Sequence, residues 1–282
     1  MIKKLRNFIY DLLYRPRVNI ALSKGGAMML SRQIDLRKPA TWEFSGFSQN
    51  GEDGIIDILR RQLLQTNRYV IEIGTGDGTE NNSSWLIVAE KYRGFMIDGN
   101  SIAIRRAKRA VENYSIGAEY VNMFVSVENV KDLVSKVQYL DPDVFSLDID
   151  GNDFYIAKEL LKNGFRPKIF VVEYNSVFGQ EQMVTVKYDK NFAFMKAHPT
   201  YLYYGVSIAG WRKFFKSQGY RFVTVDRNGV NAFFVDPNFF SKDFLDGIDS
   251  LEFSENQYQL RKFKLSSAEQ FKLISDQEFF SI

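Results

Sequence analysis

The chain reads Tyr69-Val70-Ile71-Glu72-Ile73-Gly74-Thr75-Gly76-Asp77-Gly78-Thr79 where an apolar run enters a loop with glycine at every second position. Glycine lets the backbone turn tightly there and lets a ligand lie against the main chain. Dinucleotide-binding loops have the spacing G-x-G-x-x-G, whereas this loop has G-x-G-x-G after Glu72. That spacing is expected for S-adenosylmethionine (SAM), with its amino-acid end over the loop. The alternative is a tight strand-to-helix turn beside an empty pocket.

A second acid stands where the other half of a nucleotide pocket is expected. The predicted strand 94–98 ends at Asp98, about 20 residues after the glycine loop, and an acid at that point can accept hydrogen bonds from both ribose hydroxyls. Gln49, at the helix before the first strand, can also reach this pocket. The predicted cofactor-binding residues are therefore Gln49, Glu72, Gly74, Gly76, Asp77 and Asp98.

Strand and helix patterns alternate through most of the chain. Apolar strands that alternate with helices imply a parallel sheet covered on both faces. The last two strands are joined by the glycine-bearing turn 226–229, which predicts a hairpin and hence one antiparallel strand. The predicted fold class is α/β, a Rossmann-like class I methyltransferase fold with a mostly parallel seven-stranded sheet. Strands are expected at 69–73, 94–98, 118–123, 143–148, 168–173, 220–225 and 230–235, and helices at 82–91, 101–113, 128–138, 153–163 and 207–218.

Acidic side chains gather where two of these strands end. Asp148 and Asp150 follow one strand, and Glu173 and Asn175 follow the next. The carboxyl ends of parallel strands face the ligand crevice, and carboxylate and amide oxygens suit a hard divalent cation such as magnesium or manganese. All four are predicted metal ligands, and Asp148 and Asp150 are the predicted catalytic residues. The alternative is that the acids after the strand are turn and capping residues, with Glu173 binding substrate.

Taken in order, these segments resemble the FkbM-type family of SAM-dependent methyltransferases. The resemblance rests on 47–54, Glu72 to Asn82, Leu147 to Asp153, 172–179, 204–207 and 219–235, and it spans about residues 42–237. It implies O-methylation of a hydroxyl, often on a sugar or a surface-polysaccharide precursor. The acids also resemble those of metal-dependent sugar O-methyltransferases, although Glu173-Tyr174-Asn175 departs from their paired aspartates.

Methyl transfer to a sugar hydroxyl needs an oxygen placed in line with the methyl group and shielded from water, because correct placement can supply roughly 7–11 kcal/mol. A metal would acidify the hydroxyl and fix its direction. Without a metal, a side chain must take the proton. Asp150 is the preferred base in that case, and His198, in the expected loop 196–199, is the other candidate.

Composition limits the remaining classes of function. The 282 residues carry a formal charge of only +3, which argues against dedicated nucleic-acid binding. Absence of cysteine excludes disulfides, thiolate zinc sites and cysteine nucleophiles, and the single histidine excludes histidine-rich metal sites. No apolar run reaches membrane-spanning length, and the basic N-terminus lacks a signal core, so a cytoplasmic location is expected.

The N-terminal segment predicts a basic amphipathic helix that Pro16 ends. It is expected to pack on its own domain or on a twin subunit in a homo-oligomer, with membrane association at most peripheral. The expected domains are a helical arm at 1–40, a methyltransferase domain at 41–240 and a packed C-terminal extension at 241–282. The apolar stripe of the helix consists of Leu5, Phe8, Ile9, Leu12 and Leu13.

Two other functions fit parts of this pattern. Asp148-Ile149-Asp150 resembles the D-x-D motif of metal-dependent glycosyltransferases, which lack a glycine loop followed by an acid-ended second strand. A non-catalytic binding protein that kept the fold is the other alternative, although the intact glycine loop and Asp98 argue against loss of the site. A small molecule or a glycan precursor is the expected substrate in the methyltransferase interpretation.

Overall fold

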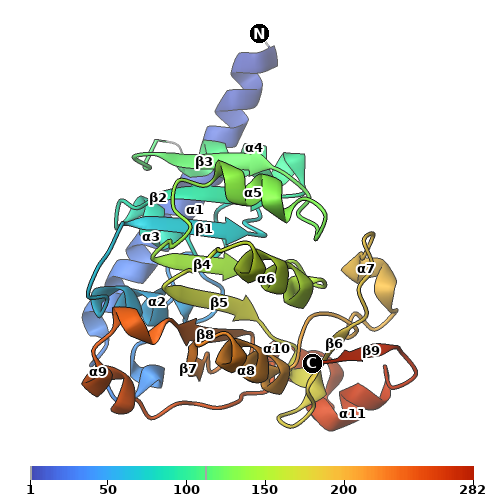
Figure 1. Cartoon of the computed structure of the whole chain (residues 1–282). Coiled ribbons are helices and arrows are strands. Elements are labelled where there is room, and N and C mark those ends of the chain that lie inside the picture. Colours follow the sequence, from blue (N-terminus) through green and yellow to red (C-terminus); the bar gives the residue numbers. More distant parts are fainter. Residues whose placement is uncertain (1, 112) are drawn as a thin grey trace.

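A seven-stranded sheet forms the middle layer of the molecule (Figure 1). The computed structural model describes the backbone of residues 2–111 and 113–282 and the side chains of residues 16–111 and 113–282. The strands of this sheet are β1 (Tyr69–Ile73), β2 (Arg93–Asp98), β3 (Ala118–Asn122), β4 (Val144–Leu147), β5 (Ile169–Glu173), β7 (Arg221–Val225) and β8 (Asn231–Val235).

The strand order is β3-β2-β1-β4-β5-β8-β7. Strands β1 to β5 pair in parallel, whereas β8 runs antiparallel to both of its neighbours. This topology confirms the predicted class I methyltransferase fold, including the single antiparallel strand in the hairpin. From β1 the chain continues to β2 and β3 on one side of the sheet and then crosses to β4 on the other side of β1. Open α/β sheets bind ligands at such a point, in the crevice outside the carboxyl ends of the strands.

Helices cover both faces because the central strands are apolar on both sides. Along β1, Ile71 and Ile73 face one buried cluster and Val70 faces the other. Helices α5, α6 and α8 contribute to the first cluster, and α1 to α4 contribute to the second (Figure 1). These helices are α1 (Ile2–Ser31), α2 (Glu52–Arg61), α3 (Ser84–Val88), α4 (Ser101–Val111), α5 (Val130–Lys136), α6 (Asp153–Lys162) and α8 (Ile208–Ser217).

Helix α1 corrects the prediction for the N-terminal arm. It continues through Pro16 to Ser31, so Pro16 does not end it. A proline inside a helix removes one hydrogen bond, but packing beyond it keeps the helix intact, since Val18 and Ala21 are buried in the core. The N-terminal part of α1 projects past the β3 edge of the sheet (Figure 1). The predicted apolar stripe between residues 5 and 13 lies outside the described side chains.

Two helices begin with different arrangements of side chains. Gly51 occupies the N-cap of α2, and the Asn50 side chain donates to Glu52 at 2.9 Å. At the start of α11 (Ser267–Lys272), Ser266 and Glu269 exchange hydrogen bonds in a capping box.

Two strands that follow β5 in the chain form a smaller sheet of their own. Strand β6 (Val184–Val186) pairs with β9 (Phe279–Ser281) in a separate antiparallel sheet. Within the described part of the chain, no helix combines the length and apolar character needed to cross a membrane. The remaining elements are η1 (Pro39–Thr41), η2 (Ser176–Phe178), α7 (Phe194–Ala197), η3 (Pro237–Phe239), α9 (Lys242–Asp246), α10 (Gln257–Phe263) and α11 (Ser267–Lys272).

Candidate functional site

The glycine loop follows β1 and is shaped by two backbone constraints. Gly74 has a φ of +93°, and a Cβ there would lie 1.7 Å from the carbonyl oxygen of Asp148, so only glycine fits. Gly76 has a φ of +57°, but a Cβ at this position would meet nothing within 4 Å. The loop therefore packs tightly on β4 at Gly74 and faces open space at Gly76.

Glu72 lies beneath this loop and is buried. Its carboxylate accepts hydrogen bonds from the backbone N–H of Asn82 at 2.9 Å, from the Thr75 hydroxyl at 3.2 Å and from the Ser83 hydroxyl. Burial raises the pKa of Glu72 to about 7. Glu72 borders only a small cavity of about 50 Å³ behind the loop, so it holds the loop in shape rather than lining the main pocket.

The pocket in front of the loop has a volume of about 510 Å³, within the range of small-molecule sites. Asp98 at the end of β2 accepts hydrogen bonds from the backbone N–H of Gly76 at 2.9 Å and of Asn100 at 2.6 Å. Met123, Phe124 and Val125 supply an apolar wall. Predicted residues that line this pocket, here called the cofactor pocket, are Gln49, Gly74, Gly76, Asp98, Asp148 and Asp150.

The predicted cofactor-binding residue Asp77 makes its contacts outside this pocket. One of its carboxylate oxygens accepts hydrogen bonds from the Thr79 hydroxyl at 2.6 Å and the Thr79 backbone N–H at 3.1 Å. The other lies 3.6 Å from the Arg17 guanidinium on α1. Asp77 is not among the residues that line the cofactor pocket, and its contacts are with Thr79 in the loop and Arg17 on α1.

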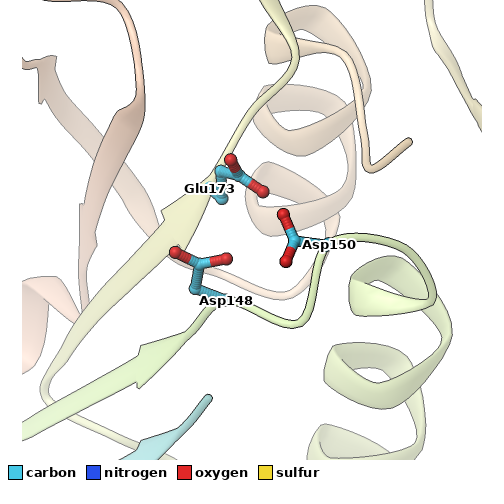
Figure 2. Close-up of side chains that lie close together, drawn as sticks. All are labelled: Asp148, Asp150 and Glu173. Carbon is cyan, nitrogen blue, oxygen red and sulfur yellow. The ribbon is translucent and has the colours of Figure 1, made fainter. Parts of the chain in front are cut away.

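Three of the four predicted metal ligands lie together. Asp148 and Asp150 after β4 and Glu173 at the end of β5 each offer an oxygen within 4.8 Å of the other two, and their carboxylates point toward one another in Figure 2. Burial, and then mutual repulsion, raises the pKa of Asp148 and Glu173 well above the usual range. Burial also raises the pKa of Asp150.

The charge of this acid cluster has no balancing partner in the described part of the chain, where none of the three forms an ion pair. One buried oxygen of Glu173 has no hydrogen-bond partner there. A proton shared between the carboxyl groups or a bound cation would relieve the repulsion. The donor set, three carboxylates from two neighbouring strand ends, fits a hard divalent cation.

The loop that carries the acids is held in an unusual conformation. Asp150 has a φ of +56°, which a non-glycine residue adopts at a cost. Asp153 stabilises the loop by accepting hydrogen bonds from the backbone N–H of Ile149 at 2.9 Å and of Gly151 at 2.8 Å. Asp153 therefore supports the loop, whereas the Asp150 carboxylate points toward those of Asp148 and Glu173.

Asn175 is not part of the cluster. Its buried amide donates to the carbonyl oxygens of Leu202 at 2.8 Å and Tyr204 at 3.0 Å and accepts from the Val177 backbone N–H at 3.1 Å. The prediction of Asn175 as a metal ligand therefore lacks support from the geometry. His198 pairs with the Thr200 hydroxyl at 2.8 Å and lines neither the cofactor pocket nor its neighbour.

A second pocket, of about 630 Å³, adjoins the first. Gln49 and Glu80 line both pockets. Glu173 lines the second pocket, whereas Asp148 and Asp150 line the first. The acid cluster thus stands at the junction of two pockets that together could hold two ligands.

Several residues of the second pocket carry no local sequence signal. Lys24 comes from α1, Asn228 from the β7–β8 turn, and Arg261 from α10. They meet only through the fold, so no motif could have identified them. Glu80, by contrast, lies just after the glycine loop, and its position next to that motif was the one available signal.

The chain matches no protein-family model and no curated protein sequence. Similar solved structures include an O-methyltransferase from Bacillus cereus in complex with S-adenosyl-homocysteine, at 14% identity, 83% coverage of this chain, 98% of that chain and a TM-score of 0.42. Streptomyces achromogenes TomG is an O-methyltransferase of tomaymycin synthesis, solved in complex with SAM. It has 17% identity, 75% coverage of this chain, 93% coverage of that chain and a TM-score of 0.43. M. capricolum TrmK in complex with S-adenosyl-homocysteine has 14% identity, 66% coverage of this chain, 69% coverage of that chain and a TM-score of 0.36.

Proposed function

We propose that the protein is a SAM-dependent methyltransferase that methylates a hydroxyl oxygen. The observation that carries this proposal is the acid cluster at the junction of two pockets. One pocket has a glycine loop and Asp98, which suit the amino-acid end and the ribose of SAM. The other has a polar lining that suits a hydroxyl-bearing acceptor. A reacting hydroxyl at the junction would lie between a methyl donor and a cluster of carboxylates.

The chain's own residues perform the positioning. SAM supplies a methyl group that its sulfonium already activates. Asp98 accepts hydrogen bonds from the ribose, and the main chain at Gly76 lets the ligand approach. Gln49 and Glu80, which line both pockets, orient the two ligands relative to each other. Such positioning can lower the barrier of the transfer by roughly 7–11 kcal/mol.

A divalent cation, magnesium or manganese, belongs to this proposal. Asp148, Asp150 and Glu173 would hold it, and its chemistry would be to lower the pKa of an acceptor hydroxyl. The unbalanced charge of the cluster and the unpartnered oxygen of Glu173 support a cation here. Without a cation, Asp150, whose pKa burial raises, is the residue placed to take the proton.

The acceptor in this proposal is a sugar or a surface-polysaccharide precursor. The second pocket contains many groups that donate or accept hydrogen bonds and few that are apolar, as a polyhydroxylated ligand requires. The sequence resemblance to FkbM-type methyltransferases implies the same class of acceptor.

Calorimetric titration with SAM tests the cofactor assignment. In Gly76→Val the new side chain would enter the pocket, so we expect the affinity for SAM to fall by at least about tenfold, or 1.4 kcal/mol. Gly164→Val is the matched control, because Gly164 also has a positive φ, of +82°, with open space around it, but does not line the pocket. Equal affinities in the two folded variants would refute the assignment, as would binding of a nucleotide sugar in place of SAM.

Calorimetry with Mn²⁺ tests the cation independently of any acceptor. We expect the protein to bind Mn²⁺ and Asp148→Asn to bind it at least about tenfold more weakly, as is typical when a metal site loses a coordinating or supporting group. Asp132→Asn, on the exposed surface of α5, serves as control and should bind as the wild type does. Absence of Mn²⁺ binding would reject the cation and leave the carboxylates as proton acceptors.

A further inference from the structure

The second pocket, which the proposed function assigns to the acceptor, is lined by charged groups of both signs. Its acids are Glu80 and Glu173, and Glu173 belongs to the acid cluster. Its cations are Lys24 on α1 and Arg261 on α10. Lys24, Arg261 and Glu80 are exposed, whereas Glu173 is half-buried, so Glu173 is less accessible to solvent than the two cations.

The two cations are available to a ligand. Within the described part of the chain neither forms an ion pair, and Lys24 makes one hydrogen bond, to the Ser45 hydroxyl at 2.9 Å. Arg227, on the neighbouring hairpin turn, differs from them, because Glu43 already neutralises it at 2.7 Å. Lys24 and Arg261 therefore combine positive charge, exposure and a place in the lining of this pocket.

The amide groups of the pocket add a second kind of recognition. The side chains of Gln49 and Asn228 line the wall and have no hydrogen-bond partner among the described residues. Free amides of this kind suit hydroxyl groups, which both donate and accept hydrogen bonds. The pocket thus offers hydrogen-bonding amides along with two acids and two cations.

We propose, on the basis of the methyltransferase function proposed above, that the acceptor carries an anionic group, a phosphate or a carboxylate, which Lys24 and Arg261 bind. Arginine and lysine are the side chains that bind such groups, and charge-assisted hydrogen bonds to them are about twice as strong as neutral ones. With its anion held by the two exposed cations, the acceptor extends its hydroxyl toward Glu173 and the acid cluster. The cations thereby determine which end of the acceptor meets the methyl donor.

A neutral acceptor would form no charge-assisted hydrogen bond with Lys24 or Arg261. A cationic acceptor would be repelled by Lys24 and Arg261 at the pocket wall. The anion also contributes to orientation, since an acceptor bound in reverse would place its negative charge against Glu173.

The experiment measures ligand binding to protein saturated with S-adenosyl-homocysteine. The probes are glucose 1-phosphate, glucuronate and glucose, which share a hydroxyl-bearing ring and differ in their charged group. We expect at least one of the two anionic probes to bind more tightly than glucose, and the phosphate and carboxylate probes distinguish the two sources of charge. In the double variant Lys24→Gln with Arg261→Gln, this preference should be lost through an affinity decrease of at least about tenfold.

The matched control is the double variant Lys196→Gln with Lys216→Gln, which removes two cations that do not line the pocket. It should keep the preference for the anionic probe. Equal binding of glucose and both anionic probes to the wild type, or an unchanged preference in the Lys24 and Arg261 variant, would overturn the proposal. Saturation with S-adenosyl-homocysteine is measured first, so its failure would count against the methyltransferase function rather than against the anionic acceptor.

Discussion

Single carboxylates shape the loops around both pockets. Asp53 accepts hydrogen bonds from the backbone N–H groups of three successive residues, 46–48, at 2.7–2.9 Å. Asp98 does the same for Gly76 and Asn100, and Asp153 for the loop after β4. Each loop directs its backbone N–H groups at the carboxyl group of one acid. The site is therefore preorganised by groups that do not themselves react.

Asp98 and Asp77 provide a comparison between two acids of the same region. Asp98→Ala removes the expected ribose contacts and frees the Gly76 N–H, so we predict that the affinity for SAM falls by at least about tenfold. Asp77→Ala should change it by less than about twofold, because Asp77 faces Arg17 and Thr79. Titration calorimetry of both folded variants measures the difference, and a larger loss in Asp77→Ala would show that the acid outside the pocket is the important one.

The site residues that could be predicted are those that belong to a recognisable local sequence pattern. Gly74 and Gly76 stand out by their spacing, and Asp98 and Asp148 by their place at the ends of apolar strands. The directions of Asp77 and Asn175 could not be predicted, since Asp77 turns toward α1 and Asn175 toward carbonyl groups near residue 203. Both partners are distant in sequence, and a side-chain direction depends on such partners.

At the level of elements, α1 connects the N-terminal segment to the second pocket. Gly25 packs against the Trp85 ring, and the same ring is the nearest neighbour of Gly46, which lines that pocket. Lys24 stands beside Gly25 on the same helix. A change in how α1 docks would therefore alter the pocket wall.

The pair Gly25 and Gly26 tests this docking. In Gly25→Ala the new Cβ would lie 2.4 Å from the Trp85 ring and 3.0 Å from the Gly46 backbone, so we predict a loss of about 1–3 kcal/mol in unfolding free energy. In Gly26→Ala the Cβ meets nothing within 4 Å, and the gain in helix propensity should stabilise by up to about 1 kcal/mol. Urea unfolding measures both, and a stabilised Gly25→Ala would contradict the docking.

A helix or strand could be predicted where the sequence pattern that specifies it is local. The strands and the helices between them follow from apolar runs and glycine turns, and their observed bounds lie within a few residues of the expected ones. The course of α1 was not predictable, because Pro16 is a local signal for an end and the burial of Val18 and Ala21 is a tertiary effect that outweighs it. Strands β6 and β9 are short and pair across a long separation, which leaves no periodicity to detect.

For the molecule as a whole, buried carboxyl groups determine how stability depends on pH. Burial raises the pKa of Asp53 and Glu72 to about 7 and of Asp226 to about 8. The folded protein therefore binds these protons more tightly than the unfolded chain does. Their contribution to stability is fully present below the unfolded pKa values, near 4, and is lost as the pH rises through the folded values.

We predict that the unfolding free energy decreases by at least about 2 kcal/mol between pH 6 and pH 8, because each pKa unit corresponds to about 1.4 kcal/mol. Urea unfolding at constant ionic strength measures this decrease. Asp226→Asn should be less stable overall, because its carboxylate accepts hydrogen bonds from the backbone N–H groups of 228, 230 and 231, but should show a weaker dependence on pH. A rise in stability over the same range would contradict the assignment.

The place of β8 in the sheet has a consequence for the newly made chain. Strand β5 leaves the ribosome well before its neighbour β8, which pairs with it only after β7 has also been made. During that interval the apolar residues 169–172 lie at an open sheet edge, and such edges recruit strands from other chains. A chain that stops before residue 221 should therefore accumulate in aggregates or on chaperones, whereas a full-length chain closes this edge with its own hairpin.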